Sequence, residues 1–151
     1  MKIRKARLTD VPVIVQIHRS VVRLAHGAHY SRRKIRAWVN NISESNCKKQ
    51  IIQDRILIAE VKKSLIGFVH FDNNGTIYEL YFVRKFWNKG YGSILLDRAE
   101  TSILRAGAHR VTLNASINSE RFYVKKGYRR RKFLQFGPEK ISLVLMSKAL
   151  D

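Results

Sequence analysis

The sequence has almost none of the residues that cross-link small domains. Its 151 residues include one cysteine, Cys47, so no disulfide can form within the chain. A single thiol also excludes a thiolate cluster and the paired cysteines of a zinc site. Stability must therefore come from packing. Because 45% of the residues are hydrophobic, we expect one domain with one core over residues 1–151.

Long apolar runs are missing as well. No segment approaches the roughly 20 apolar residues that cross a bilayer. The opening residues 1–5 (MKIRK) also lack the apolar stretch of a secretion signal. We therefore expect a cytoplasmic protein that does not bind a membrane.

Acidic residues are scarce. The chain has 11 Asp and Glu against 30 Lys and Arg, which gives a formal net charge of +19. Basic residues concentrate at 2–7, at 32–36 and above all at 125–132, next to Phe133 and Phe136. Such a stripe can hold the phosphates of a nucleic acid or another acidic partner. It can equally be a solvated face that keeps a basic protein in solution.

Helical and strand periodicities alternate along the chain without a linker or repeat, which predicts a mixed α/β (α+β) domain. Apolar steps of three and four residues predict helices after Thr9, which we expect to be a cap, after Ser31, around Ile94–Leu104, and at 119–126. Short β-branched runs predict strands at 3–6, 56–61, 65–71, 77–83, 110–114, 128–134 and 141–146.

One connection between a strand and a helix has the pattern of an anion site. Residues 81–93 (YFVRKFWNKGYGS) place Gly90 and Gly92 at the start of a helix. Amides at a helix N-terminus have no intrahelical partner and carry a partial positive charge, and glycines let an anion approach the backbone. This geometry suits a pyrophosphate. Because a lone Gly-x-Gly also fits a plain tight turn, the pattern needs support from its context.

That context is a resemblance to the GNAT acetyltransferases over nearly the whole length. The matching segments are 88–92 (NKGYG), 115–119 (ASINS), Phe122-Tyr123, Gly127-Tyr128 and the opening 3–10, while Tyr30-Ser31 with Ala37-Trp38 resembles one subgroup. The resemblance implies a GNAT-like fold with a central, mostly antiparallel, twisted sheet of about six to seven strands. About four helices would flank this sheet. It also implies acetyl-CoA as the co-substrate.

The resemblance further assigns the residues that hold the co-substrate. The family loop binds the pyrophosphate of coenzyme A through backbone amides, which implies this role for Asn88, Lys89, Gly90, Tyr91, Gly92 and Ser93. The backbone N–H of Phe82 or Val83 is expected to polarise the thioester carbonyl where the strand splays. Asn118 is similar to a residue that contacts the pantetheine arm, although a helix cap explains this asparagine equally well.

Two positions depart from the family pattern. Trp87 stands where the family usually has Gln or Arg, and Arg84 stands where it often has Pro. Because backbone groups hold the phosphates, we expect binding to survive both changes. Trp87 would act on the conformation of the loop. Arg84, Lys85 and Lys89 would attract the phosphates by charge.

Two residues are candidates for proton transfer. An amine with a pKa near 10 is mostly protonated at neutral pH, so a base must take its proton. Glu79 is our candidate, because similar enzymes often place an acid on this strand; a surface carboxylate paired with an arginine is the alternative. Tyr123 matches the family position whose hydroxyl protonates the departing thiolate, and a core aromatic residue is its alternative.

The histidines give little sign of a metal. His26 and His29 lie close in sequence but lack a third ligand at a suitable spacing, so we expect no metal site. Either can border the acceptor pocket, as the corresponding loop does in similar folds. Either can also be an ordinary surface histidine.

We therefore expect an N-acetyltransferase that moves acetyl from acetyl-CoA to an amine by direct attack on the thioester. The acceptor would be a small molecule, a peptide or an aminoacyl group. Polyamines and aminoglycosides need an acidic cleft, for which this chain has few carboxylates, whereas an amine on an anionic body would be steered by the basic surface. The alternative is a GNAT-like basic module that has lost the chemistry and binds RNA or an acidic protein.

Overall fold

In the computed structural model, which describes residues 1–27, 29–53 and 55–151, seven strands form one sheet in the order β1-β2-β3-β4-β5-β7-β6. The strands are β1 Lys2–Lys5, β2 Arg55–Val61, β3 Ser64–Phe71, β4 Thr76–Phe82, β5 Arg110–Ser116, β6 Arg129–Phe136 and β7 Ile141–Ala149. The α-helices are α1 Val11–His26, α2 Arg32–Asn40, α3 Glu44–Gln53, α4 Tyr91–Arg105 and α5 Glu120–Lys125. None of these helices is both long and apolar enough to cross a membrane.

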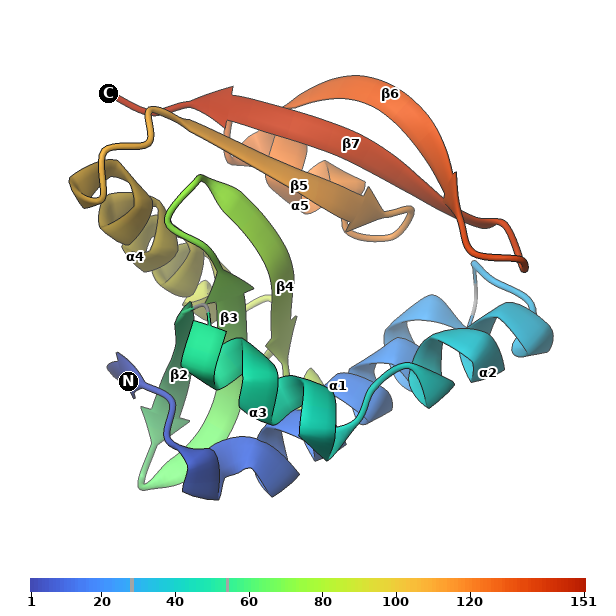
Figure 1. Cartoon of the computed structure of the whole chain (residues 1–151), viewed down its shortest axis with the longest axis horizontal. Coiled ribbons are helices and arrows are strands. Elements are labelled where there is room, and N and C mark those ends of the chain that lie inside the picture. The colour runs from blue at the N-terminus through green and yellow to red at the C-terminus, as the bar shows by residue number, and fades with distance from the viewer. Residues whose placement is uncertain (28, 54) are drawn as a thin grey trace.

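The helices cover the sheet unevenly. α1 and α3 pack on one face of β2–β4, and α4 packs on the other face (Figure 1). Two apolar cores result, one beneath α1 to α3 and one beneath α4 and α5. On β5, β7 and β6 only α5 and the end of α4 contribute cover, and both lie on one face. In the described part of the chain, the opposite face of these three strands carries no helix.

The sheet divides between β4 and β5. Every other strand pair is antiparallel, whereas β4 and β5 are parallel and pair only at Thr76↔Thr112 and Ile77↔Leu113. Beyond Ile77 the two strands diverge, and Figure 1 shows them opening away from each other. β4 stays paired with β3 as far as Phe82. The later part of β4 therefore presents backbone groups to a gap rather than to a neighbouring strand.

The mixed fold, the mostly antiparallel sheet and its seven strands confirm the sequence prediction. α3 is the helix that the prediction missed. It buries only Cys47 among the residues of Glu44–Gln53, so its sequence has little apolar periodicity to detect. The expected cap at Thr9 is wrong, because a 3₁₀ turn at Leu8–Asp10 precedes α1 and Asp10 is the N-cap.

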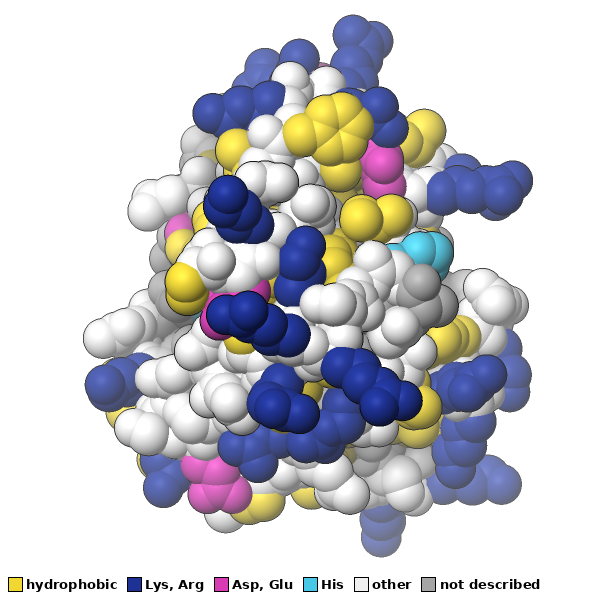
Figure 2. Space-filling view, turned by 90° about the vertical axis from the view of Figure 1, so that its right-hand side faces the viewer, with side chains coloured by type: hydrophobic (Ala, Val, Ile, Leu, Met, Phe, Trp, Pro, Cys, Tyr) yellow, Lys and Arg dark blue, Asp and Glu magenta, His cyan; other side chains and the backbone are white. Residues whose placement is uncertain are grey.

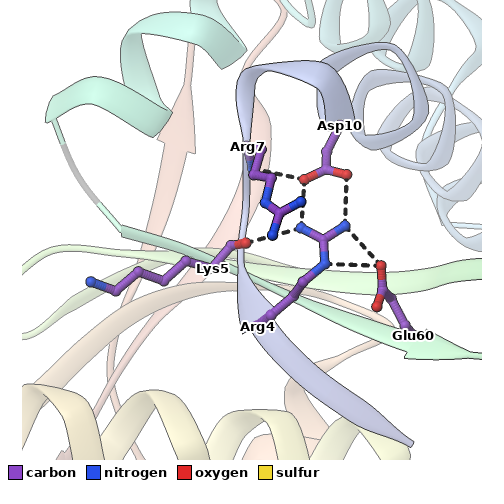
Figure 3. A network of polar contacts seen from close by, with 5 residues as sticks. All are labelled: Arg4, Lys5, Arg7, Asp10 and Glu60. Carbon is purple, nitrogen blue, oxygen red and sulfur yellow. Dashed lines mark hydrogen bonds and ion pairs between the residues drawn. The ribbon is translucent and has the colours of Figure 1, made fainter. Parts of the chain in front are cut away.

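One polar network joins the outer strand β1 to the rest of the domain (Figure 3). The Arg4 guanidinium donates to both carboxylate oxygens of Asp10 at 2.9 Å and to Glu60 Oε1 at 2.7 Å. The Arg7 N–H also donates to Asp10. These contacts join β1, β2 and the start of α1. The hydrogen bond from Arg4 is the main reason that the pKa of Asp10 lies below its usual value.

We predict that Asp10→Asn lowers the unfolding free energy at pH 7 by about 1–2 kcal/mol, because Arg4 loses a charge-assisted pair. A carboxyl group with a lowered folded-state pKa stabilises the protein above its unfolded pKa, and this stabilisation disappears as the pH falls through the folded value. The difference from wild type therefore shrinks below about pH 4. Urea unfolding of both proteins at several pH values measures this difference in unfolding free energy.

Asp97→Asn is the matched control, since Asp97 is 57% exposed beside Lys126 and such pairs contribute less than about 1 kcal/mol. Equal losses in the two variants at pH 7 would contradict a specific role for the Arg4 network.

Candidate active site

The loop between β4 and α4 presents a row of unpaired amides. After a 3₁₀ turn at Arg84–Phe86, Asn88 and Gly90 adopt left-handed conformations with φ of 57° and 82°. α4 begins at Tyr91, and its first backbone hydrogen bond runs from Ile94 N–H to Gly90 O at 3.2 Å. Among the described residues, the N–H groups of 88–93 donate to no other group. These amides are therefore free to bind an anion.

Trp87 anchors this loop to the end of β4. Its indole Nε1–H donates to the Phe82 carbonyl at 2.6 Å, and its ring packs against both apolar cores. The side chain consequently ties the loop to the end of β4. It also forms part of the wall of the cleft described below.

The backbone of β4 distinguishes the two amides that we predicted for the thioester carbonyl. Val83 N–H donates to Ile66 O at 2.8 Å, so it is already used in the pairing with β3. Hydrogen-bonding direction alternates along an antiparallel pair, so the preceding Phe82 N–H points to the side from which β5 has diverged. Of the two candidates, the amide of Val83 is therefore paired with β3, and the amide of Phe82 is the one that faces the gap.

A cleft of about 850 Å³ occupies the gap between β4 and β5. Of the predicted residues, it is lined by Glu79, Phe82, Asn88, Gly90, Gly92, Ser93, Asn118 and Tyr123. Val83, Lys89 and Tyr91 are not among its lining residues. Tyr91 packs on Phe86 at 5.9 Å between ring centroids, and Lys89 Nζ lies 5.6 Å from the centroid of the same ring. One continuous space thus brings most of the predicted site together.

The phenol of Tyr123 lies in this cleft although its side chain is 7% exposed. Its ring packs edge-on against Phe122 and Tyr128. Burial raises the pKa of Tyr123 well above its ordinary value, so the hydroxyl stays protonated at physiological pH. The residue is therefore a core aromatic that also forms part of the cleft wall.

Asn118 is exposed and lines the same cleft. The N-cap of α5 is Ser119, so the alternative assignment of Asn118 as the helix cap is wrong. Asn118 instead contributes to the wall of the cleft.

Glu79 lies between two histidines and has no arginine partner among the described residues. Its Oε1 is 3.6 Å from His18 Nδ1 and its Oε2 is 3.4 Å from His70 Nδ1. Burial raises the pKa of Glu79, but the interactions with His70 and His18 outweigh burial and hold this pKa below its usual value. Burial lowers the pKa of His18 despite the nearby carboxylate. The site therefore pairs an ionised carboxylate with a largely neutral imidazole.

Sequence reasoning missed both histidines. His18 belongs to the apolar stripe of α1, three residues before Val21 and four after Ile14, which is a signal that a polar group is held in the interior. His70 is opposite Glu79 in the register of β3 and β4, and this pairing is visible only in the folded sheet.

A second cavity also reaches Glu79. It has a volume of about 260 Å³, lies between α1 and α3, and shares His18, Asn41 and Glu79 with the large cleft. Its other polar lining residues are Ser43, Asn46, Lys49, Gln50 and Gln53. The carboxylate consequently contacts two spaces, one beside the β4–β5 gap and one lined largely by polar side chains.

Tyr30 fixes the connection between α1 and α2 to the far side of the cleft. Its hydroxyl donates to Ser142 O at 2.8 Å and accepts from Ile117 N–H at 3.1 Å. The hydroxyl thereby joins this connection to β7 and to the end of β5. His29, which precedes it, is exposed and does not line the cleft, and the side chain of His26 lies outside the described residues.

Comparison with known proteins shows the family to which the chain belongs. A profile described as "Acetyltransferase (GNAT) domain" matches residues 27–150. The chain belongs to the GNAT acetyltransferase family. A comparison with curated protein sequences finds no significant match.

Solved structures of other GNAT proteins have the same fold. A GCN5-related N-acetyltransferase (Aminotransferase, Class-II) from Rhodopseudomonas palustris superposes with a TM-score of 0.92 at 23% identity, over 99% of this chain and 95% of that chain. PaiA N-acetyltransferase from Thermoplasma acidophilum, in complex with coenzyme A, superposes with a TM-score of 0.82 at 22% identity, over 98% of both chains. YncA from Salmonella typhimurium, with its cofactor acetyl-CoA, superposes with a TM-score of 0.74 at 21% identity, over 100% of this chain and 94% of that chain.

Proposed function

We propose that this GNAT protein is an acetyl-CoA-dependent N-acetyltransferase in which an amine attacks the thioester directly. The observation that carries the proposal is the cleft between β4 and β5, which places unpaired amides, a carboxylate and a buried phenol along one space. Structures of PaiA and YncA that contain coenzyme A or acetyl-CoA support the choice of donor.

The chain offers suitable groups along the length of the donor. The amides of 88–93 hold the pyrophosphate, and the nearby cations Arg84, Lys85 and Lys89 add attraction for its charge. Asn118 contacts the pantetheine arm between the diverging strands. Phe82 N–H donates to the thioester carbonyl and stabilises the negative charge that develops on its oxygen.

Glu79 acts as the general base. Its lowered pKa keeps the carboxylate ionised at neutral pH, so it accepts the proton of the incoming ammonium group directly or through water. His18 takes up that proton in turn, and the polar cavity between α1 and α3 gives it a route away from the donor. This arrangement separates the path of the proton from the path of the substrates.

Tyr123 acts as the general acid. Because burial keeps its phenol protonated, the hydroxyl can deliver a proton to the sulfur as the C–S bond breaks. A binding module that had lost the chemistry would need neither this phenol nor an ionised carboxylate at the same cleft.

We predict that Glu79→Gln lowers kcat/KM about 10²- to 10⁴-fold at pH 7. The deficit narrows as the pH approaches the pKa of the amine, about 10, because the acceptor is then neutral without a base. Release of free thiol from acetyl-CoA, screened with amino acids, small amines, peptides and charged tRNA, provides the assay.

Asp97→Asn, a change to an exposed carboxylate on α4 that does not line the cleft, is the control and keeps the wild-type rate. A Glu79→Gln protein with the wild-type pH profile would exclude Glu79 as the base. If no acceptor in the screen gave thiol release, the result would favour the non-catalytic module.

We also predict a separation between two glycine variants. Gly90 and Gly107 both have left-handed conformations, with φ of 82° and 99°, and both have open space where a Cβ would lie. Alanine therefore costs about 1–2 kcal/mol of stability at either position. Only Gly90→Ala also weakens coenzyme A binding, by about tenfold, because it displaces amides that hold the pyrophosphate.

Thermal unfolding and calorimetric titration measure the two effects. Equal affinities for coenzyme A in the two glycine variants would refute the role of the 88–93 amides.

A further inference from the structure

The uncovered face of β5, β7 and β6 continues from the cleft. Asn114 on β5 and Leu143 on β7 line the cleft. Because side chains alternate along a strand, Arg110 on β5 and Ser147 on β7, each four residues away, point to the same side. The strand register confirms this placement, since Thr112 is opposite Ser147.

Two guanidinium groups converge on one hydroxyl on this face. Arg110 Nη1 donates to Ser147 Oγ at 3.3 Å, and Arg131 Nε donates to the same atom at 2.6 Å. Ser147 is 3% exposed, so the oxygen that holds both arginines is fixed in the sheet. Arg129 is opposite Ser147 in the register of β6, and Lys132 is opposite Leu145, which brings them to the same side.

These four cations, Arg110, Arg129, Arg131 and Lys132, are named here the β5–β6 basic cluster. None of them forms an ion pair with a carboxylate among residues 1–27, 29–53 and 55–151. On the opposite face of the same strands, Arg130 pairs with Glu120 and Lys148 pairs with Glu100. The cations facing the helices are therefore neutralised, whereas those on the uncovered face are not.

Protection of a sheet edge accounts for only part of this cluster. Lysine and arginine on an edge strand discourage pairing with other chains, and β6 is such a strand. Arg110, however, belongs to β5, which has neighbours on both sides. Placing its guanidinium beside that of Arg131 costs electrostatic free energy, which a bound anion between them would offset.

The exposed apolar side chains on this face suit a nucleic acid better than an acidic protein. Leu134 and Phe136 are opposite Leu143 and Ile141 in the register, and Phe136 lines the cleft while Leu134 lies between it and Lys132. Phe136 is 43% exposed. An aromatic ring beside a row of cations is the combination on which bases stack while phosphates are held.

The distance to the cleft also limits the size of the ligand. Four residues of strand separate Asn114 from Arg110, about 13 Å at roughly 3.3 Å per residue. A free amino acid cannot reach from Glu79 to the cluster, whereas an amine attached to a chain of nucleotides can. Lys and Arg also predominate over Asp and Glu on the adjoining face that carries α2 and the β6–β7 turn (Figure 2).

We propose that the β5–β6 basic cluster binds the phosphates of a single-stranded nucleic-acid segment, and that the acceptor is an amine carried by that segment. The binding surface is independent of catalysis. The identity of the acceptor rests on the proposed acetyltransferase function. In this arrangement, phosphates lie along β5 and β6, a base contacts Phe136, and the amine extends into the cleft toward Glu79.

The binding test compares two double variants of equal charge. A fluorescent single-stranded RNA oligonucleotide is titrated at several salt concentrations. For Arg110→Gln with Arg131→Gln, affinity falls at least tenfold at low salt, and the slope of log K against log salt decreases by about 1.4, or 0.7 per lost phosphate contact. Arg98→Gln with Arg105→Gln removes two exposed arginines of α4 and leaves affinity within about twofold.

Equal losses of RNA affinity in the two double variants would overturn the proposed binding site, because the net charge of the protein alone would then explain binding. An acidic peptide of the same charge is the second ligand. If it bound as tightly as RNA and lost affinity equally in Arg110→Gln/Arg131→Gln, the nucleic-acid assignment would be overturned in favour of an acidic protein.

The catalytic test uses two acceptors that share one reactive amine, an aminoacylated oligonucleotide and the corresponding small amine ester. Arg110→Gln/Arg131→Gln lowers kcat/KM for the oligonucleotide about tenfold and leaves the small acceptor unchanged. An equal effect on both would overturn the acceptor assignment. Absence of thiol release with every acceptor would overturn the proposed function, while selective loss of RNA binding would still support the surface.

Discussion

The parallel contact between β4 and β5 ends after two register positions, and the site depends on that early ending. A sheet that stayed paired would use the backbone groups of β4 in a ladder and leave no space between the strands. Because the strands diverge, Phe82 N–H faces a cleft and the chain leaves β4 beside it. The left-handed residues Asn88 and Gly90 then turn the backbone so that the amides at the start of α4 open toward the same space.

Acidic and basic side chains are distributed differently over the molecule. The few carboxylates are mostly committed to specific partners, such as Asp10 and Glu60 with Arg4 or Glu100 with Lys148. Among the described residues, Glu79 is the carboxylate that lines the cleft, and histidines rather than arginines flank it. The histidines hold the pKa of Glu79 below its usual value, so this carboxylate remains ionised at neutral pH. The surplus positive charge is left on surfaces such as the uncovered face of β5, β7 and β6.

Local patterns in the sequence predicted the elements and much of the candidate site. Gly90 and Gly92 mark the start of α4 because a left-handed turn and a close approach to backbone both favour glycine. Glu79 and Tyr123 were singled out through the resemblance to the GNAT family and not through a local pattern. α3 was missed, because a helix that buries a single residue has no strong apolar period.

Contacts between segments that are distant in the sequence could not be predicted from local sequence patterns. His70 lies beside Glu79 because of the strand register, and the Val83 amide is paired with Ile66 of β3. Arg110 and Arg131 both donate to Ser147 because the strand order is β5-β7-β6. Each of these contacts depends on which strands become neighbours in the sheet. The periodicity along a single strand does not determine its neighbours.

Backbone amide resonances test the proposed binding of acetyl-CoA most directly, because the groups proposed to bind it are main-chain N–H groups. In ¹H–¹⁵N spectra of the full chain titrated with acetyl-CoA, we predict the largest shifts at the amides of 88–93 and Phe82, with Val83 much less affected. Saturable binding that left those amides unshifted, or no binding by folded protein, would contradict this proposal.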